Sequence, residues 1–310
     1  MTNQGVSATG GRPRPEGAVM ADFQIIDAHV HLWEPRARDW YPDLHAYAEH
    51  LDKPVLLERH LFADYLDRES PVALAGIVHV SATTGRHAYL DEAQWLDKEL
   101  DTRPTASVTI GTVDPRLEAD DLLAHLDRQA ESPRFRGIRV FSGLEPGSAA
   151  CEAILSWLAG RGLVFDLVAD PATLPAWVRT LEAFPDLTVV LEHLGSPEGA
   201  EPEAMARWVT ATREAARATG WMCKFSGLGM LLPEFTTASV RPWLESAVDV
   251  WGWDRLLFGS NMPMDAMTVG HEELLDTVLE LVTSTATASE AHRFFDDNAR
   301  RTYDLPPANR

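Results

Sequence analysis

The nine residues Phe23–His31, FQIIDAHVH, run an apolar, β-rich segment into two histidines that are one residue apart. Alternate side chains of a strand point to the same face, so His29 and His31 should project together. Imidazole nitrogens bind zinc and related metals at about 2.0–2.1 Å, so two rings on one face can reach one ion. The segment therefore predicts the first strand of the fold and, at its end, part of a metal site. Two solvated histidines at a strand end are the alternative.

Beyond this segment, short apolar runs alternate with amphipathic stretches. Eight runs predict strands at 23–30, 72–80, 105–113, 137–141, 163–169, 187–193, 221–226 and 255–260. The stretches between them predict helices at 117–131, 149–160, 174–184, 203–218, 239–251 and 274–283, with an appended C-terminal helix at 289–298. Strands that alternate with helices indicate an α/β protein, here a (β/α)8 TIM barrel, with a doubly wound sheet as the alternative. The sequence lacks the glycine-rich phosphate loops of nucleotide-binding doubly wound sheets.

Length and composition agree with one catalytic domain. A chain of 310 residues with 45% hydrophobic side chains is long enough for one barrel of about 250 residues. We expect a disordered tail at 1–20, rich in Gly, Pro, Ser and Thr, and one barrel domain at 21–310. Cys151 and Cys223 lack C-x-x-C spacing, and no apolar run suits a signal peptide or membrane span. A soluble, cytoplasmic protein with reduced cysteines is therefore expected.

The formal net charge is −20, which opposes binding to nucleic acid or to an anionic membrane surface. An anionic substrate would need local positive charge, and Arg139 and Lys224 are placed at strand ends to supply it. The oligomeric state stays open, a homo-oligomer included.

Active sites of TIM barrels lie at the C-terminal ends of the strands, and this sequence gathers polar residues there. In chain order these residues are His29, His31, His79, Arg139, Asp166, Glu192, His193, Lys224, Ser226 and Asn261.

Five segments resemble, in order and spacing, motifs of the amidohydrolase superfamily. They are DAHVHLW (27–33), RGIR (136–139), LEHLG (191–195), KFSGL (224–228) and FGSNMP (258–263). More narrowly, the chain from about residue 23 to 305 is similar to the amidohydrolase-related branch that contains 2-pyrone-4,6-dicarboxylate lactonase and the sugar-acid lactonases. The resemblance implies a TIM-barrel hydrolase that acts on ester bonds, most directly on lactones.

The resemblance also implies roles for individual residues. His29 and His31 match the metal pair of strand one, His193 matches a histidine that polarises the substrate or completes the metal shell, and Arg139 matches a carboxylate binder. One divalent ion, zinc as the first choice, would have the three histidines as ligands. Metal-independent action is the alternative, with the histidines as hydrogen-bond donors to the oxyanion, because the pyrone lactonase is understood to work without a metal.

The chain departs from its relatives at Asn261, where the superfamily places the aspartate that takes a proton from the attacking water. An amide cannot act as a general base. We consider His79, Glu192, Asp265 and a metal-bound hydroxide as replacements, since a divalent ion can lower the pKa of bound water to about 7.

We therefore predict a lactone hydrolase in which His193, Asn261 and His79 are catalytic. The predicted substrate-binding residues are Arg139, Lys224, Ser226 and Trp33. His79 has the alternative of a buried ring bonded to backbone, and Lys224 that of an ion pair with a strand-end carboxylate.

A lid is predicted at 33–53. Seven further histidines are expected to be solvated: His45, His50, His60, His87, His125, His271 and His292. Two other functions stay open: a metal-dependent decarboxylase of an aromatic or muconate-type acid, and a non-catalytic relative that lost its base.

Overall fold

A computed structural model describes residues 24–66, 72–102 and 105–306, so the predicted tail at 1–20 lies outside the described residues. Eight parallel strands form one sheet in sequential order. They are β1 (Gln24–Val30), β2 (Ala73–Val80), β3 (Ala106–Gly111), β4 (Phe135–Arg139), β5 (Val164–Leu167), β6 (Thr188–Leu191), β7 (Met222–Phe225) and β8 (Leu256–Phe258). All eight predicted strands are present, and the sequential order excludes the doubly wound alternative.

The sheet curls into a nearly closed barrel because its first and last strands meet. The backbone N–H of Asn261 donates to the carbonyl of His29 at 2.8 Å, and that of His31 donates to Met262 at 2.8 Å. Both bonds lie beyond β8, at the C-terminal end of the barrel. Closure therefore ties the two histidines of the first strand to the loop that carries Asn261.

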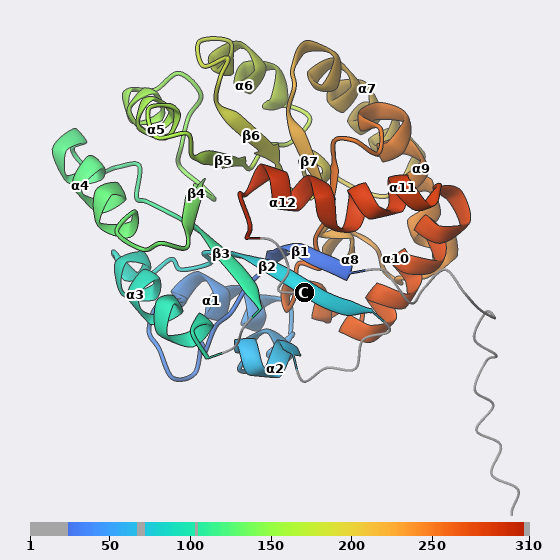
Figure 1. Ribbon diagram of the computed structural model, residues 1–310, viewed down its shortest axis with the longest axis horizontal. Helices are drawn as coiled ribbons and strands as arrows, with labels where there is room; N and C mark the ends of the chain where they lie inside the picture. The colour runs from blue at the N-terminus through green and yellow to red at the C-terminus, as the bar shows by residue number, and fades with distance from the viewer. Residues whose placement is uncertain (1–23, 67–71, 103–104, 307–310) are drawn as a thin grey trace, which may run out of the picture.

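Helices surround the barrel in chain order (Figure 1). The outer ring is α3 (Ala88–Leu100), α4 (Ala119–Gln129), α5 (Ala149–Ala159), α6 (Leu174–Leu181), α7 (Pro202–Ala218), α9 (Thr237–Trp251) and α10 (His271–Thr285). Shorter helices are α1 (Pro42–His50), α2 (Phe62–Leu66), α8 (Leu228–Leu231), α11 (Ala288–His292) and α12 (Asn298–Thr302). The sequence did not predict α1, α2, α3 or α8. No helix of the described chain combines the length and the apolar character needed to cross a bilayer.

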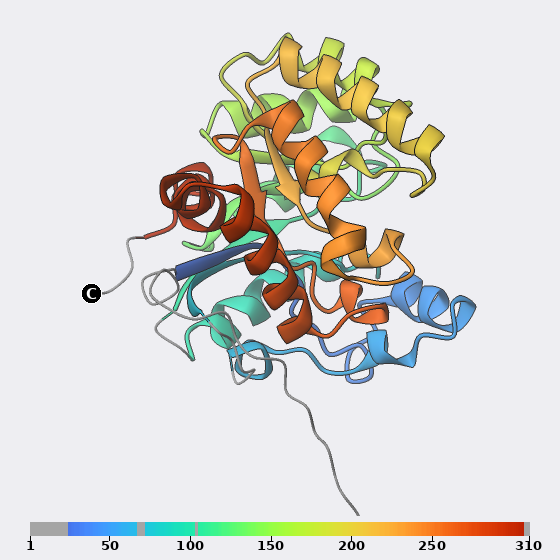
Figure 2. The same ribbon diagram turned by 90° about the vertical axis from the view of Figure 1, so that its right-hand side faces the viewer.

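The barrel has an inner and an outer core. The inner core contains Val78, Val108 and Leu257 from the strands, and Tyr303 and Leu305 from the C-terminal segment also belong to it. Figure 2 views the barrel from the side and shows the red C-terminal helices at one end and the blue α1 at the other. The C-terminal segment thus fills the end of the barrel opposite the predicted site.

The segment predicted as a lid packs as a small core of its own. Trp33 and Tyr41 are buried together with Leu56, and the backbone of Trp33 pairs with that of His60. The expectation that His60 and His271 are solvated is wrong, because both side chains are buried. His60 bonds the carbonyl of His31 through Nδ1 at 2.7 Å, so it supports the backbone of the histidine pair. Cys151 and Cys223 are free and buried, as predicted.

Candidate active site

The two histidines of the first strand face one another across 3.3 Å, measured from Nε2 to Nε2. The register between β1 and β2 shifts between Asp27 and Val30. Such an irregularity re-aims side chains, so that His29 turns inward while Asp27, two residues earlier, points outward. The predicted juxtaposition of His29 and His31 is therefore present, and the register shift contributes to it together with strand alternation.

Asp27 supports this pair from the other face of the strand. Its Oδ1 accepts from the backbone N–H of His29 at 3.1 Å and of Ser260 at 2.9 Å, and its Oδ2 accepts from Tyr65 at 2.6 Å. Burial raises the pKa of Asp27, although these donors oppose the rise. The carboxyl group thus fixes the first strand against the loop after β8.

Two consecutive residues after β6 both turn into the site. Glu192 is buried, and His193 adopts left-handed backbone angles with φ of 48°. In an extended strand, neighbours would point to opposite faces; the left-handed turn lets both side chains point inward. The Nδ1 of His193 lies 2.9 Å from Oγ of Ser226. Gly227 is needed beside it, since an added Cβ would lie 2.8 Å from that nitrogen.

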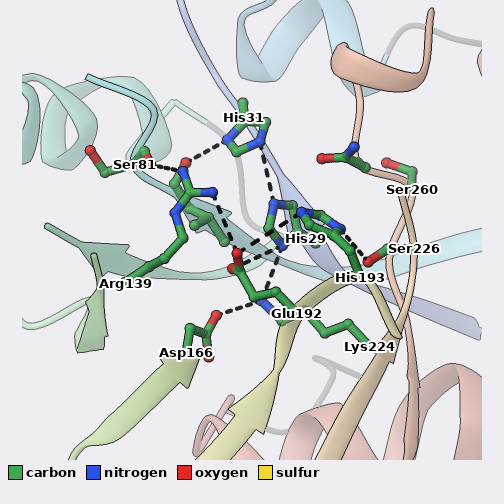
Figure 3. A network of polar contacts seen from close by, with 12 residues as sticks. His29, His31, Ser81, Arg139, Asp166, Glu192, His193, Lys224, Ser226 and Ser260 are labelled. Carbon is green, nitrogen blue, oxygen red and sulfur yellow. Dashed lines mark hydrogen bonds and ion pairs between the residues drawn. The ribbon is translucent and has the colours of Figure 1, made fainter. Parts of the chain in front are cut away.

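Glu192 lies at the centre of the charged groups (Figure 3). Its Oε2 is 3.4 Å from Nη1 of Arg139, and its Oε1 is 3.3 Å from Nδ1 of His29 and 3.6 Å from Nζ of Lys224. Burial alone would raise the pKa of Glu192, but the two cations outweigh it and hold that pKa below its ordinary value. Glu192 is therefore an anion and a weak base. The sequence offered it only as a candidate base.

Lys224 is fully buried beneath the histidines. Its ammonium pairs with Asp166 at 2.5 Å and donates to Nδ1 of His29 at 3.2 Å. Tyr303, from the C-terminal segment, donates to the other oxygen of Asp166 at 2.8 Å. Burial raises the pKa of Asp166 to about 6, although Lys224 opposes the rise. The ion pair matches the structural alternative for Lys224, and its predicted contact with substrate stays a prediction.

Arg139 keeps hydrogen-bonding capacity for a ligand. It donates to the carbonyl of Ser81 and to Glu192, but its Nε–H has no partner among the described residues. The guanidinium lies 5.4 Å from the ring of Phe141, whose side chain is 66% exposed. Its position beside an exposed ring suits a group that meets a ligand arriving from solvent.

The three imidazoles of the site are neutral at physiological pH. Burial lowers the pKa of His29 and His31 well below 6.5, and Lys224 and Arg139 add to the effect. Burial likewise lowers the pKa of His193 to about 4. Neutral rings are the form that binds a metal ion.

These residues fit a metal ion. Two nitrogens bound to one ion at about 2.05 Å with tetrahedral angles lie about 3.3 Å apart, which is the separation of the two Nε2 atoms. Within the described chain, one group of three ligand residues converges within 4.8 Å, and it consists of His29, Glu192 and His193. The sequence predicted His29, His31 and His193 as ligands. The converging group includes the carboxylate of Glu192 in addition to His29 and His193, and His31 lies next to this group in contact with His29.

Asn261 is paired with Asp265. Its Nδ2 donates to Oδ1 of Asp265 at 2.7 Å, and Oδ2 of Asp265 accepts from the backbone of Gly229 at 2.8 Å. Asn261 is buried with a φ of 54°, and its Oδ1 has no partner in the described structure. A buried acceptor without a partner costs about 1–3 kcal/mol unless a ligand or water fills it. The amide therefore presents an acceptor to whatever binds beside it.

The two remaining predicted residues lie around the histidine pair. His79 accepts from the backbone of Leu32 at 3.1 Å, and its Nε2 is 3.7 Å from Glu92. This arrangement matches the backbone-bonded alternative for His79. Trp33 is buried and stacks parallel to His31, with ring centres 5.6 Å apart. Catalysis by His79 and substrate contact by Trp33 stay predictions.

Comparison with known proteins places the chain among hydrolases. The family model described as Amidohydrolase matches residues 26–305. An uncharacterised protein, y4mH, from Sinorhizobium fredii is 29% identical over 92% of this chain and 99% of its own. An L-fucono-1,5-lactonase from Burkholderia ambifaria is 28% identical over 79% of this chain and 82% of its own. The structure of an amidohydrolase from Burkholderia multivorans with bound zinc is similar at a TM-score of 0.70 and 25% identity, over 92% of this chain and 100% of that one.

The pairing of Asn261 with Asp265 predicts a pH-dependent stability. Burial raises the pKa of Asp265 to about 7, ahead of the opposing hydrogen bonds from Gly229 and Asn261. The native state then holds a proton that the unfolded chain loses above pH 4, so stability falls as the pH rises toward 7. Between pH 5 and pH 8 the free energy of unfolding of Asp265→Asn should decrease by about 2–3 kcal/mol less than that of the unsubstituted protein, measured by urea unfolding.

Asp186→Asn, at an exposed position, serves as the control and should leave the pH dependence as it is in the unsubstituted protein. An Asp265→Asn variant with the same pH dependence as the unsubstituted protein would show that Asp265 titrates normally.

Proposed function

This chain belongs to the amidohydrolase family, and we propose that it is a hydrolase that opens a small lactone at the C-terminal end of its barrel. The observation that carries the proposal is the cluster of three neutral imidazoles beside Arg139 and the unpartnered acceptor of Asn261. Hydrogen-bond donors that need not ionise suit a reaction in which negative charge develops on a carbonyl oxygen. The lactonase relatives add support for this chemistry.

Two of the chain's own groups, the pair Ser226–His193 and Asn261, can take part in such a reaction. Water adds to the ring carbonyl carbon, and the carbonyl electron pair moves to oxygen. In the metal-independent form of the reaction, Ser226 can donate to Nδ1 of His193, which leaves the ring hydrogen on Nε2 for that oxyanion. The carbon–oxygen bond of the ester then breaks. One proton of the water ends on the leaving alkoxide oxygen and the other goes to solvent, so the ring opens to a hydroxy-carboxylate with net release of one proton. Asn261 orients the water through Oδ1 but takes no proton.

One divalent ion, zinc as the first choice, is part of the proposal. His29 and His193 with Glu192 would hold it, and His31 lies at the right distance to replace or join them. A bound divalent ion supplies Lewis-acid polarisation of the carbonyl and lowers the pKa of water. A related amidohydrolase has been crystallised with zinc, and a metal is typical of the superfamily.

We further propose that the substrate is anionic and that the protein works in the cytoplasm. The guanidinium of Arg139 is buried beside the cluster, and its Nε–H has no partner among the described residues. A planar guanidinium suits a carboxylate. Because the chain has a net charge of −20, this local cation has to offset an unfavourable overall field. The two free buried cysteines agree with a reducing compartment.

The direct test is a panel of small lactones followed by proton release with a pH indicator. We expect turnover of at least one lactone that carries a carboxylate, because ring opening of an ester releases one proton. Release of CO2 from aromatic or muconate-type acids without lactone turnover would favour a decarboxylase. Absence of both reactions, with ligand binding retained, would favour a non-catalytic relative.

Arg139→Met should raise KM for the preferred lactone acid by ten-fold or more. The reason is loss of a charge-assisted hydrogen bond worth about 1.5–3 kcal/mol. The neutral methyl ester of the same lactone is the matched substrate, and its KM should change much less. Equal effects on the acid and the ester would show that Arg139 acts through Glu192 and the fold rather than through the substrate.

Asn261→Asp should lower kcat/KM by ten-fold or more. The new carboxylate would lie beside the carboxylate of Asp265, where the amide now donates at 2.7 Å, and would repel an anionic substrate. The exchange variant Asn261→Asp/Asp265→Asn keeps one amide and one carboxyl group, and should recover stability in urea unfolding relative to the single variant. Faster lactone hydrolysis by Asn261→Asp would instead identify position 261 as a lost base.

A further inference from the structure

We propose that Lys224 controls metal binding at this site: its ammonium holds His29 in the ring tautomer with hydrogen on Nε2, which opposes a divalent ion. The inference deepens the proposed function and rests on the site assigned to it. It concerns ring hydrogens and metal affinity, so turnover is not needed to test it.

The first support is the environment of Nδ1 of His29. This nitrogen lies between Nζ of Lys224 at 3.2 Å and Oε1 of Glu192 at 3.3 Å. The contact with Lys224 is a hydrogen bond, whereas Oε1 of Glu192 makes none. An ammonium can only donate, so Nδ1 must accept. In a neutral imidazole the hydrogen is then on Nε2.

The second support comes from the other end of the histidine pair. Nδ1 of His31 lies 2.7 Å from the carbonyl oxygen of Val80, which can only accept. Nδ1 of His31 therefore carries its ring hydrogen, and its Nε2 accepts. The 3.3 Å contact between the two Nε2 atoms then needs a hydrogen from His29. The contact of Lys224 with Nδ1 of His29 and the contact of His31 with Nε2 of His29 thus indicate the same tautomer.

This tautomer conflicts with a metal ion. An ion needs the lone pair of Nε2 of His29, so the ring hydrogen has to move to Nδ1 and the ammonium has to give up its bond there. Oε1 of Glu192 is then the acceptor for the new N–H, as carboxylates beside metal-bound histidines commonly are, and the other oxygen of Glu192 would be left to bind the ion. Lys224 and Glu192 therefore compete for one nitrogen, and Lys224 adds a positive charge near the incoming cation.

A purely structural lysine would behave differently. If Lys224 only neutralised Asp166, its removal would leave the tautomer of His29 unchanged and would loosen the site. If Lys224 holds the tautomer, its removal frees Nδ1 for Glu192 and strengthens metal binding. The two roles predict opposite changes in zinc affinity.

The tautomer can be read directly in the unsubstituted protein. We would label the histidines with 15N, strip metal with a chelator, and record multiple-bond 1H–15N correlations of the rings, with His29→Ala to assign the signals. We expect the hydrogen of His29 on Nε2. A hydrogen on Nδ1 of His29 would overturn the proposal, whatever the variants do.

Zinc affinity gives the second readout, by competition with a chromophoric chelator. Lys224→Met and Lys224→Met/Asp166→Asn should bind zinc at least ten-fold more tightly than the unsubstituted protein. The double variant removes both charges of the ion pair, so no unpaired carboxylate is buried. Asp166→Asn alone keeps the ammonium at His29 and should gain no affinity, and His29→Ala should abolish the site. Unchanged or weaker zinc binding by the folded double variant would overturn the proposal.

Discussion

The site depends on a balance of buried charge. Arg139 and Lys224 face Glu192 and Asp166 with almost no access to water, so each ion has to be compensated by its neighbours. The two cations keep Glu192 ionised. Burial keeps the nearby imidazoles neutral, and the two cations add to that effect because a protonated ring would be repelled by them. Neighbouring parts of the barrel supply these charges: β4, β5 and β7 carry Arg139, Asp166 and Lys224, and the turn after β6 carries Glu192.

The sequence predicted the parts that follow from local periodicity. Apolar runs of strand length indicated all eight strands, and the spacing of His29 and His31 indicated rings that face one another. The contacts that the sequence did not predict join residues that are far apart in the chain. An ion pair of Lys224 with a strand-end carboxylate was one alternative, but its partner was not identified. Lys224 meets Asp166 because two strands separated by another lie in one curved sheet, and their spacing of 58 residues does not signal it. The buried state of His60 likewise depends on a contact with the carbonyl of His31.

Local backbone geometry explains the other gaps. Strand alternation would place Glu192 and His193 on opposite faces, and only the left-handed turn at His193 brings both inward. Asn261 departs from the pattern that the resemblance implies, and no sequence motif indicated its partner. The structure pairs it with Asp265, which lies in the short helix at Met264–Met267, so an amide and a carboxyl group lie together after β8.

Tyr303 links the end of the chain to this balance. Its hydroxyl bonds Asp166 while its ring fills the inner core at the far end of the barrel. Strands β1 and β8 also have to meet before His29 and Asn261 are neighbours. The chain is synthesised from its N-terminus. The first strand is therefore made before the last strand with which it pairs, and Asp166 is made before its partner Tyr303. The charged interior can therefore be completed only after the chain has been made as far as Tyr303, so the order of synthesis delays assembly of the site.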